Sequence, residues 1–173
     1  SHIRDEGNYS VGLIAAVNEV IRIAEEAKLP GIVSHMKVLG PDSWGLSVAA
    51  TTRLNMARRR GVEVFADQYP YTASSTSLTG AFIPRWAQVG GEAELQRRMG
   101  APETRRRLIE EVRTNLRRRG GAASQIIAFS RQDRSLEGRS LADIAEMRRQ
   151  APEETTLNLV AEGGASIVSF NMS

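Results

Sequence analysis

Residues 31–38 read Gly-Ile-Val-Ser-His-Met-Lys-Val, a short run of apolar and β-branched residues that also carries a histidine and a lysine. Pro30-Gly31 stands at its start and Gly40-Pro41 follows it, and such residues commonly end regular structure. We therefore predict a strand from Ile32 to Val38.

Segments on both sides of this strand have the spacing of amphipathic helices. Residues 11–28 repeat apolar side chains at helical spacing with Ser10 as the expected N-cap, and residues 46–60 end in arginines followed by Gly61. Residues 62–67 then form a second short apolar run. This alternation of helix and strand predicts βαβ units in a parallel sheet.

Three polar residues recur at one period along the chain. His2 and His35 are 33 residues apart, and His35 and Asp67 are 32 residues apart. A (β/α)8 barrel of about 250 residues uses roughly 31 residues for each unit. We therefore expect an α/β fold that forms part of a TIM barrel, with equivalent positions at the ends of neighbouring strands.

Alternation within the predicted strand suggests which side chains face the barrel interior. Val33, His35 and Lys37 share one face, whereas Ile32 lies on the other face, which we expect to pack against helices. Barrel enzymes build their active sites at the carboxyl ends of the strands. His35 and Lys37 are therefore candidate site residues.

Both histidines of the chain fall at the repeated positions, and two interpretations are open. A single histidine is usually a hydrogen-bonded structural residue. Two imidazoles at adjacent strand ends can instead share one divalent metal such as zinc, which lowers the pKa of a water molecule. His2 and His35 would then be two ligands of a metal site that needs further ligands.

Other polar side chains near these positions allow more than one role. Lys37 could extend into solvent or hold a substrate carboxylate, and Asp67 could bind metal, act as a base or cap the turn that follows it. The ring of Tyr69 could simply pack in an extended segment, or its phenol could donate a hydrogen bond to a substrate oxygen. The polar loop that follows supplies hydroxyl groups at Ser74 and Ser75.

The barrel period ends near residue 78, and the later sequence changes in character. We divide the chain into barrel units over 1–77, a helical Arg-rich insertion over 78–124 and a return to barrel units over 125–173, with the last strand of the barrel outside the chain. The elements expected in the last part are a strand over Gln125–Phe129, helices over 140–149 and 153–161, and an apolar segment over 166–170.

Composition limits the chemistry and the location of the protein. The chain has no cysteine, which excludes disulfides, thiolate metal sites and a cysteine nucleophile within it. No apolar run approaches the roughly 20 residues that cross a bilayer, and the first residues lack the apolar core of a signal peptide. We therefore expect a cytoplasmic protein with no membrane partner.

The net charge of +3 conceals a basic segment. All of the 23 basic residues except Lys28 and Lys37 are arginines, and nine arginines lie within residues 97–119 against three glutamates. Such a segment can bind nucleic acid. We favour a solvated helical face and expect no nucleic-acid partner, because aromatic residues do not alternate with these arginines.

Three segments carry distinctive motifs. They are Ser1-His2-Ile3-Arg4-Asp5-Glu6, Ser34-His35-Met36-Lys37 with the later Trp44-Gly45, and Ala66-Asp67-Gln68-Tyr69-Pro70-Tyr71 continuing to Ser74. Together they resemble, in order and spacing, the D-aminoacylases (N-acyl-D-amino-acid deacylases) of the amidohydrolase superfamily. Later segments resemble the same family, namely Pro84-Arg85-Trp86, Ser140 to Ala145 and Val168 to Ser173.

The resemblance implies a metal-dependent (β/α)8 barrel with a small insertion. It implies that His2 and His35 bind the tightly held zinc ion at the ends of strands five and six. The residues that it implies for binding the α-carboxylate of a D-amino acid are Lys37, Tyr69 and Ser74 or Ser75. Tyr69 would also act in catalysis by polarising the scissile carbonyl.

The resemblance further implies that the chain is part of a longer enzyme. The family has a His-x-His pair and a bridging ligand before this region, and an acid/base aspartate in a Ser-Asp motif after it. We expect a fragment that is inactive alone, from a zinc amidohydrolase that cleaves N-acyl-D-amino acids. A dihydroorotase-like or hydantoinase-like hydrolase and an Arg-rich nucleic-acid-binding module are the alternatives. Open barrel edges predict self-association of the fragment.

Overall fold

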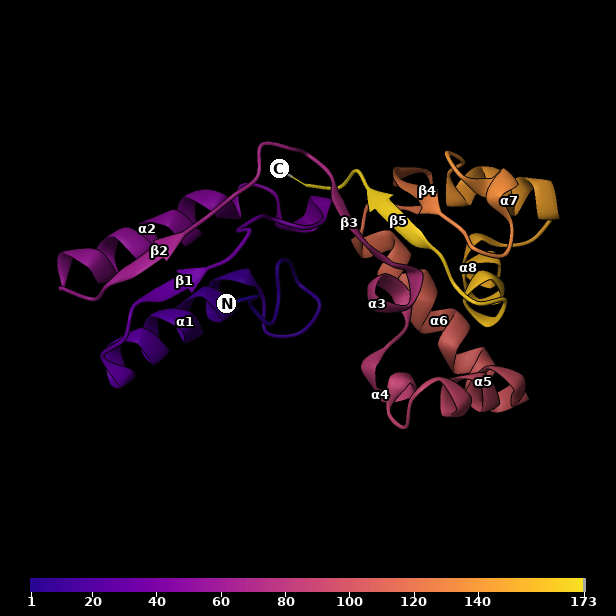
Figure 1. Ribbon diagram of the computed structural model, residues 1–173, viewed down its shortest axis with the longest axis horizontal. Helices are drawn as coiled ribbons and strands as arrows, with labels where there is room; N and C mark the ends of the chain where they lie inside the picture. The colour runs from indigo at the N-terminus through magenta and orange to yellow at the C-terminus, as the bar shows by residue number, and fades with distance from the viewer. Residues whose placement is uncertain (173) are drawn as a thin grey trace. The chain divides into compact units, whose positions relative to one another are not determined.

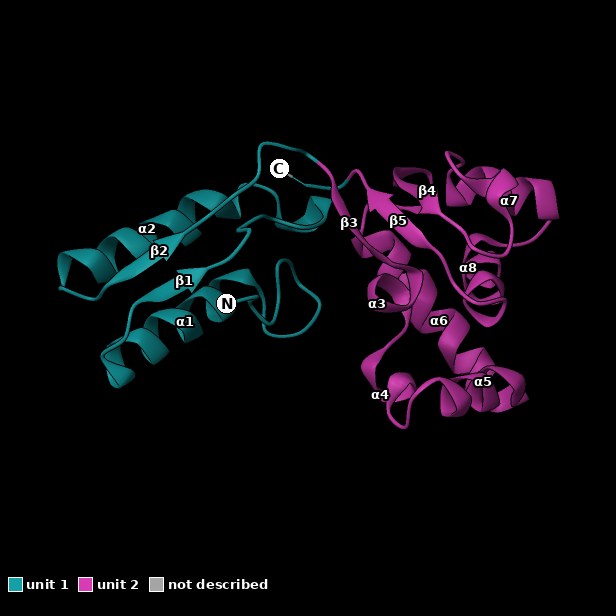
Figure 2. Ribbon diagram, in the orientation of Figure 1, with its two compact units in different colours: residues 1–72, 171–173 teal, residues 73–170 magenta. Residues whose placement is uncertain are grey.

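The computed structural model describes residues 1–172, and these residues form two compact units (Figure 2). Unit 1 comprises residues 1–72 together with Asn171 and Met172, and unit 2 comprises residues 73–170. Each unit has its own buried apolar cluster. The expected boundaries at 77/78 and 124/125 therefore do not coincide with the divisions at 72/73 and 170/171.

Unit 1 is a short parallel βαβ arrangement covered by two helices (Figure 1). Strands β1 and β2 are parallel, with Ile32 beside Phe65 in the register. In chain order, the elements are α1 (Leu13–Ala27), β1 (Gly31–Val33), the 3₁₀ turn η1 (Pro41–Ser43), α2 (Leu46–Arg59) and β2 (Val64–Ala66).

The two faces of this small sheet differ in exposure. Val33 and Val64 are fully buried in the cluster that α1 and α2 cover. Ile32 and Phe65, on the opposite face, remain 46% and 41% exposed. Burial on the helical side is the expected consequence of apolar residues at helical spacing in α1.

The structure contradicts the expected orientation of the strand that contains Val33. Regular strand structure ends at this residue, and His35 adopts a positive φ of 42°, a left-handed conformation that interrupts alternation. Val33 therefore faces the helices and Ile32 the open side, the reverse of the prediction. Helix α1 also begins after Gly12, with no side-chain cap, so Ser10 is not its N-cap.

Unit 2 combines helices with a three-stranded antiparallel sheet in the order β3-β5-β4 (Figure 1). In chain order, the elements are β3 (Ser74–Ser77), α3 (Leu78–Phe82), α4 (Arg85–Gln88), α5 (Glu92–Gly100), α6 (Pro102–Arg118), η2 (Ala122–Ser124), β4 (Gln125–Phe129), η3 (Arg134–Leu136), α7 (Leu141–Arg148), α8 (Pro152–Ala161) and β5 (Ser166–Ser169).

Residues 125–170 form the expected helices and strands, but these strands do not pair in the expected parallel sheet. Strand β4 has the predicted bounds, and Ser140 caps α7 through a capping box with Asp143. The central strand β5 pairs antiparallel with both β3 and β4, and its Ile167 is fully buried. Residues 125–170 thus fold together with residues 78–124 rather than extending a parallel sheet.

Many arginines of the basic segment contact acidic side chains within unit 2. Hydrogen bonding from Arg97 lowers the pKa of the Glu94 carboxyl to about 2. Arg113 on α6 lies 2.6 Å from Glu153, which is buried on α8. Further ion pairs join Arg98 to Glu94 and Arg107 to Glu111. Part of the positive charge is therefore matched inside the unit.

Within residues 1–172, no helix has the length and apolar character that a membrane crossing requires.

Candidate metal centre

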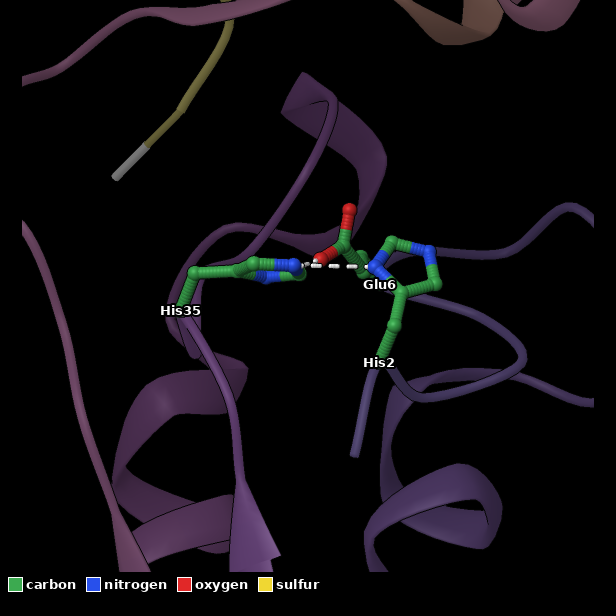
Figure 3. Close-up of side chains that lie close together, drawn as sticks. All are labelled: His2, Glu6 and His35. Atoms are coloured by element: carbon green, nitrogen blue, oxygen red, sulfur yellow. Dashed lines mark hydrogen bonds and ion pairs between the residues drawn. The ribbon is translucent and has the colours of Figure 1, made fainter.

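Two histidines separated by 33 positions in the sequence meet in unit 1. His2 Nδ1 lies 2.9 Å from His35 Nε2, and the ring centroids are 4.8 Å apart in an edge-on arrangement. Figure 3 shows both imidazoles converging with the carboxylate of Glu6. In this group, the potential ligand atoms all lie within 4.8 Å of one another.

Glu6 connects this histidine pair to Lys37. Its Oε1 atom lies 3.1 Å from His35 Nδ1 and forms an ion pair with Lys37 Nζ. The Lys37 ammonium also lies 2.9 Å from His35 Nδ1 and donates to the His35 carbonyl at 3.1 Å. The side chains of Glu6 and Lys37 are each only 10% exposed, so solvent screens this pair weakly.

Asp67 positions His35 through the backbone. The His35 N–H donates to Asp67 Oδ1 at 2.6 Å, and the Met36 N–H donates to the Asp67 carbonyl at 2.8 Å. Asp67 therefore stabilises the left-handed turn just beyond β1. This contact is to the turn at His35, beside β2, and not to the turn that follows Asp67 in the chain, which the sequence suggested.

Glu6 is held by the loop that precedes α1. The carboxylate of Asp5 accepts hydrogen bonds from the backbone N–H groups of Gly7, Tyr9, Ser10 and Gly12. The Glu6 carbonyl accepts from the Leu39 N–H at 2.8 Å, and a Cβ at Gly7 would lie 2.5 Å from the Leu39 carbonyl oxygen. Close backbone packing thus fixes the position from which Glu6 reaches His35.

Tyr69 lies near Lys37 at the edge of a cavity. The Lys37 Nζ atom is 5.7 Å from the centroid of the Tyr69 ring, and the Tyr69 hydroxyl donates to Met172 Sδ at 3.5 Å. Both side chains line a cavity of about 470 Å³ in unit 1, together with Met36 and Val38. Burial, with a smaller effect of the Glu6 charge, raises the pKa of Tyr69, which keeps the phenol a hydrogen-bond donor.

The predicted site residues are divided between the two units. His2, His35, Lys37 and Tyr69 all lie in unit 1, whereas Ser74 and Ser75 lie on β3 in unit 2, opposite Ser169 and Val168 of β5. Unit 1 thus brings together the two histidines, Lys37 and Tyr69. Glu6 joins them without having been singled out from the sequence, although it follows His2 by four residues.

The donor set fits a partial zinc site. Two imidazole nitrogens bound to one tetrahedral zinc ion at about 2.0–2.1 Å would lie roughly 3.3 Å apart. The observed 2.9 Å between His2 Nδ1 and His35 Nε2 is close to that separation. Glu6 is already paired with Lys37, so the histidines are the natural ligands and other positions around the ion stay open.

Comparisons with known proteins support a specific relationship. The chain is 41% identical over 78 residues to an N-acyl-D-glutamate deacylase of Alcaligenes xylosoxydans xylosoxydans, a match that covers 45% of the chain. It is 38% identical over the same length to a D-aminoacylase of that organism. The chain is similar to a segment of the D-aminoacylases. No protein-family model matches it.

The similarity to D-aminoacylases extends to the solved structures. The whole chain superposes on an N-acyl-D-glutamate deacylase from Bordetella bronchiseptica with a TM-score of 0.68 and 28% identity. That enzyme was crystallised with zinc and a phosphonate inhibitor that mimics the tetrahedral intermediate. The matches cover 28% of that structure and 15% of each curated relative, so the chain corresponds to a minor part of these enzymes.

Proposed function

We propose that this chain is part of a zinc-dependent deacylase that hydrolyses N-acyl-D-amino acids to a carboxylate and a D-amino acid. The observation that carries the proposal is the contact between His2 Nδ1 and His35 Nε2 at 2.9 Å. Two imidazoles brought together from segments 33 positions apart suit a shared divalent ion. The whole-chain similarity to a zinc-containing deacylase supports the same assignment.

The sheet of unit 1 supports a place in a (β/α)8 barrel. Parallel sheets normally have both faces covered, whereas Ile32 and Phe65 stand exposed on one face of β1 and β2. In a barrel, this face would point to the interior and the helices would form the outer layer. The histidines, which lie beyond the strands, would then stand at the active-site end.

Each site residue has a distinct proposed role. A zinc ion held by His2 and His35 would supply Lewis acidity and a water molecule of lowered pKa. The third proton of the Lys37 ammonium would bind the substrate α-carboxylate while the others engage Glu6 and the His35 carbonyl. Tyr69, a phenol whose pKa is raised further above its ordinary value of 10, would donate a hydrogen bond to the scissile carbonyl.

For Ser74 and Ser75, the proposed contact with the same carboxylate rests on the family resemblance. A complete site also needs ligands and an acid/base group from the rest of the enzyme. The small share of the relatives that the chain spans supports this inference. We therefore propose that residues 1–173 alone have no deacylase turnover.

Zinc titration of residues 1–173 tests the metal site directly. We expect weak zinc binding that His35→Ala removes, while Asp42→Ala, an exposed acidic residue in η1, leaves it unchanged. In the longer enzyme, His35→Ala should abolish zinc-dependent hydrolysis of N-acetyl-D-glutamate. Retained activity would contradict the ligand assignment, and preference for cyclic imides over N-acyl-D-amino acids would favour a hydantoinase-like enzyme.

A further inference from the structure

Three side-chain atoms form a close triangle beside the histidine pair. His35 Nδ1 lies 3.1 Å from Glu6 Oε1 and 2.9 Å from Lys37 Nζ, and the last two atoms form an ion pair. The carboxylate and the ammonium are both nearly buried, whereas the imidazole is 35% exposed. His35 Nδ1 therefore faces one group that only accepts hydrogen bonds, Glu6, and one that only donates them, Lys37.

The chemistry of these groups allows two arrangements. A carboxylate only accepts and an ammonium only donates, but a neutral imidazole nitrogen can do either. If Nδ1 carries the proton, it donates to Glu6 and leaves a lone pair on Nε2. If Nδ1 accepts from Lys37, the proton is on Nε2, the atom that lies 2.9 Å from His2. Only the first arrangement lets His35 bind a metal through Nε2.

We propose that Glu6 is a positioning residue that holds the proton of His35 on Nδ1 and thereby keeps Nε2 available for the metal. This inference rests on the proposed function, since it assigns Nε2 as the ligand atom. Either hydrogen bond of Nδ1 would be charge-assisted, from the Lys37 ammonium or to the Glu6 carboxylate, but Lys37 already has two other acceptors, which favours donation from Nδ1 to Glu6. A carboxylate partner on the second ring nitrogen also makes an imidazole a stronger metal ligand.

Lys37 Nζ lies at hydrogen-bond distance from His35 Nδ1 but has two other acceptors. Its ammonium already engages the Glu6 carboxylate and the carbonyl oxygen of His35. In the proposed arrangement, Glu6 binds the Lys37 ammonium and also accepts a hydrogen bond from the Nδ1–H of His35. In this way, a single carboxylate orients both the proposed metal ligand and the proposed carboxylate-binding residue.

The backbone around Glu6 gives this arrangement the rigidity that orientation requires. The Glu6 carbonyl accepts from Leu39, and the next residue, Gly7, has no room for a side chain against the same backbone. Four backbone N–H groups bound to Asp5 fix the following turn. Glu6 therefore approaches His35 from a fixed point.

Nitrogen NMR of the two histidines tests the proposal on residues 1–173 without added metal. The measurement is made at about pH 8, above the ordinary imidazole pKa of about 6.5, where ¹⁵N shifts distinguish the two tautomers of a neutral imidazole. We expect wild-type His35 to carry its proton on Nδ1. We expect Glu6→Ala to move that proton to Nε2 and Glu6→Gln, whose amide oxygen can still accept, to preserve the wild-type state.

A matched control is Glu19→Ala, which removes a carboxylate paired with Arg4 and should leave His35 unchanged. Zinc titration should show affinity lowered about 10–100-fold by Glu6→Ala and little changed by Glu19→Ala. Wild-type His35 with its proton on Nε2, or an Nδ1 proton that persists in a folded Glu6→Ala variant, overturns the proposal. The wild-type measurement decides even if Glu6→Ala does not fold, and loss of zinc-dependent activity in the longer enzyme on His35→Ala tests the proposed function separately.

Discussion

At the scale of single residues, Asp5 organises the loop that carries the site. Burial alone would raise the pKa of its carboxyl, but hydrogen bonds from the backbone of Ser10, Gly7, Gly12 and Tyr9 outweigh burial and lower the pKa. The carboxylate therefore stabilises the folded chain at neutral pH. This stabilisation is lost as the pH falls through the lowered pKa of the folded state.

We expect Asp5→Ala to lower the free energy of unfolding by about 2–4 kcal/mol at about pH 7, because several charge-assisted hydrogen bonds are lost together. Urea unfolding measures this difference, which should shrink as the pH falls below the ordinary carboxyl value of 3.8 and through the lowered pKa of the folded state. Asp42→Ala, at an exposed position, should change stability by less than about 0.5 kcal/mol. Equal effects of the two substitutions would contradict the role of Asp5.

The sequence identified some residues of the candidate site and missed another. The period of 33 residues indicated that His2 and His35 occupy equivalent positions, and their nitrogens lie 2.9 Å apart. No comparable spacing marks Glu6, because it stands beside other charged residues, Arg4 and Asp5. Glu6 is recognised as a site residue only through its contacts with the His35–Leu39 segment, which the tertiary structure supplies.

At the scale of elements, helices were more predictable than strands. The observed ends of α1 and α2 lie within two residues of the ends predicted from sequence, because helical spacing of apolar residues is a local property. The strand expected over 32–38 ends at Val33, since Asp67 stabilises a left-handed turn at His35. That turn contains neither Gly nor Pro, so no local signal in the sequence marks it.

The capping box of α7 offers a test at this scale. The Ser140 hydroxyl accepts from the Asp143 N–H at 3.1 Å, and the Asp143 carboxylate accepts from the Ser140 N–H at 3.0 Å. We expect Ser140→Ala to destabilise unit 2 by about 1 kcal/mol in urea unfolding.

Thr114→Ala is a suitable control for this cap. The Thr114 hydroxyl bonds to a carbonyl of its own helix α6, so its removal should have little effect. A loss of stability no larger for Ser140→Ala than for Thr114→Ala would show that the capping box contributes little.

At the scale of the whole molecule, the pairing within unit 2 could not be derived from local patterns. Strand β3 reads Ser-Ser-Thr-Ser, a sequence that suggested a polar loop. It becomes a strand because β5, more than 80 positions later, supplies an antiparallel partner. Such non-local pairing depends on the packing of the whole unit, whereas the exact bounds of β4 followed from its own apolar run.

The uncovered sheet face of unit 1 predicts how the isolated chain behaves in solution. Ile32 and Phe65 lie side by side on this face, and each strand of the pair has one edge with no partner strand among the described residues. Exposed apolar faces and open strand edges favour association between chains. We therefore expect the molar mass of residues 1–173 in light scattering to rise with concentration.

Replacing both Ile32 and Phe65 by lysine should reduce this association, because buried ammonium groups would be costly to desolvate. Ile23→Lys, on an exposed position of α1, should not reduce it. A wild-type chain that stays monomeric at all concentrations, or a double variant that associates as strongly as wild type, would contradict the assignment of this face.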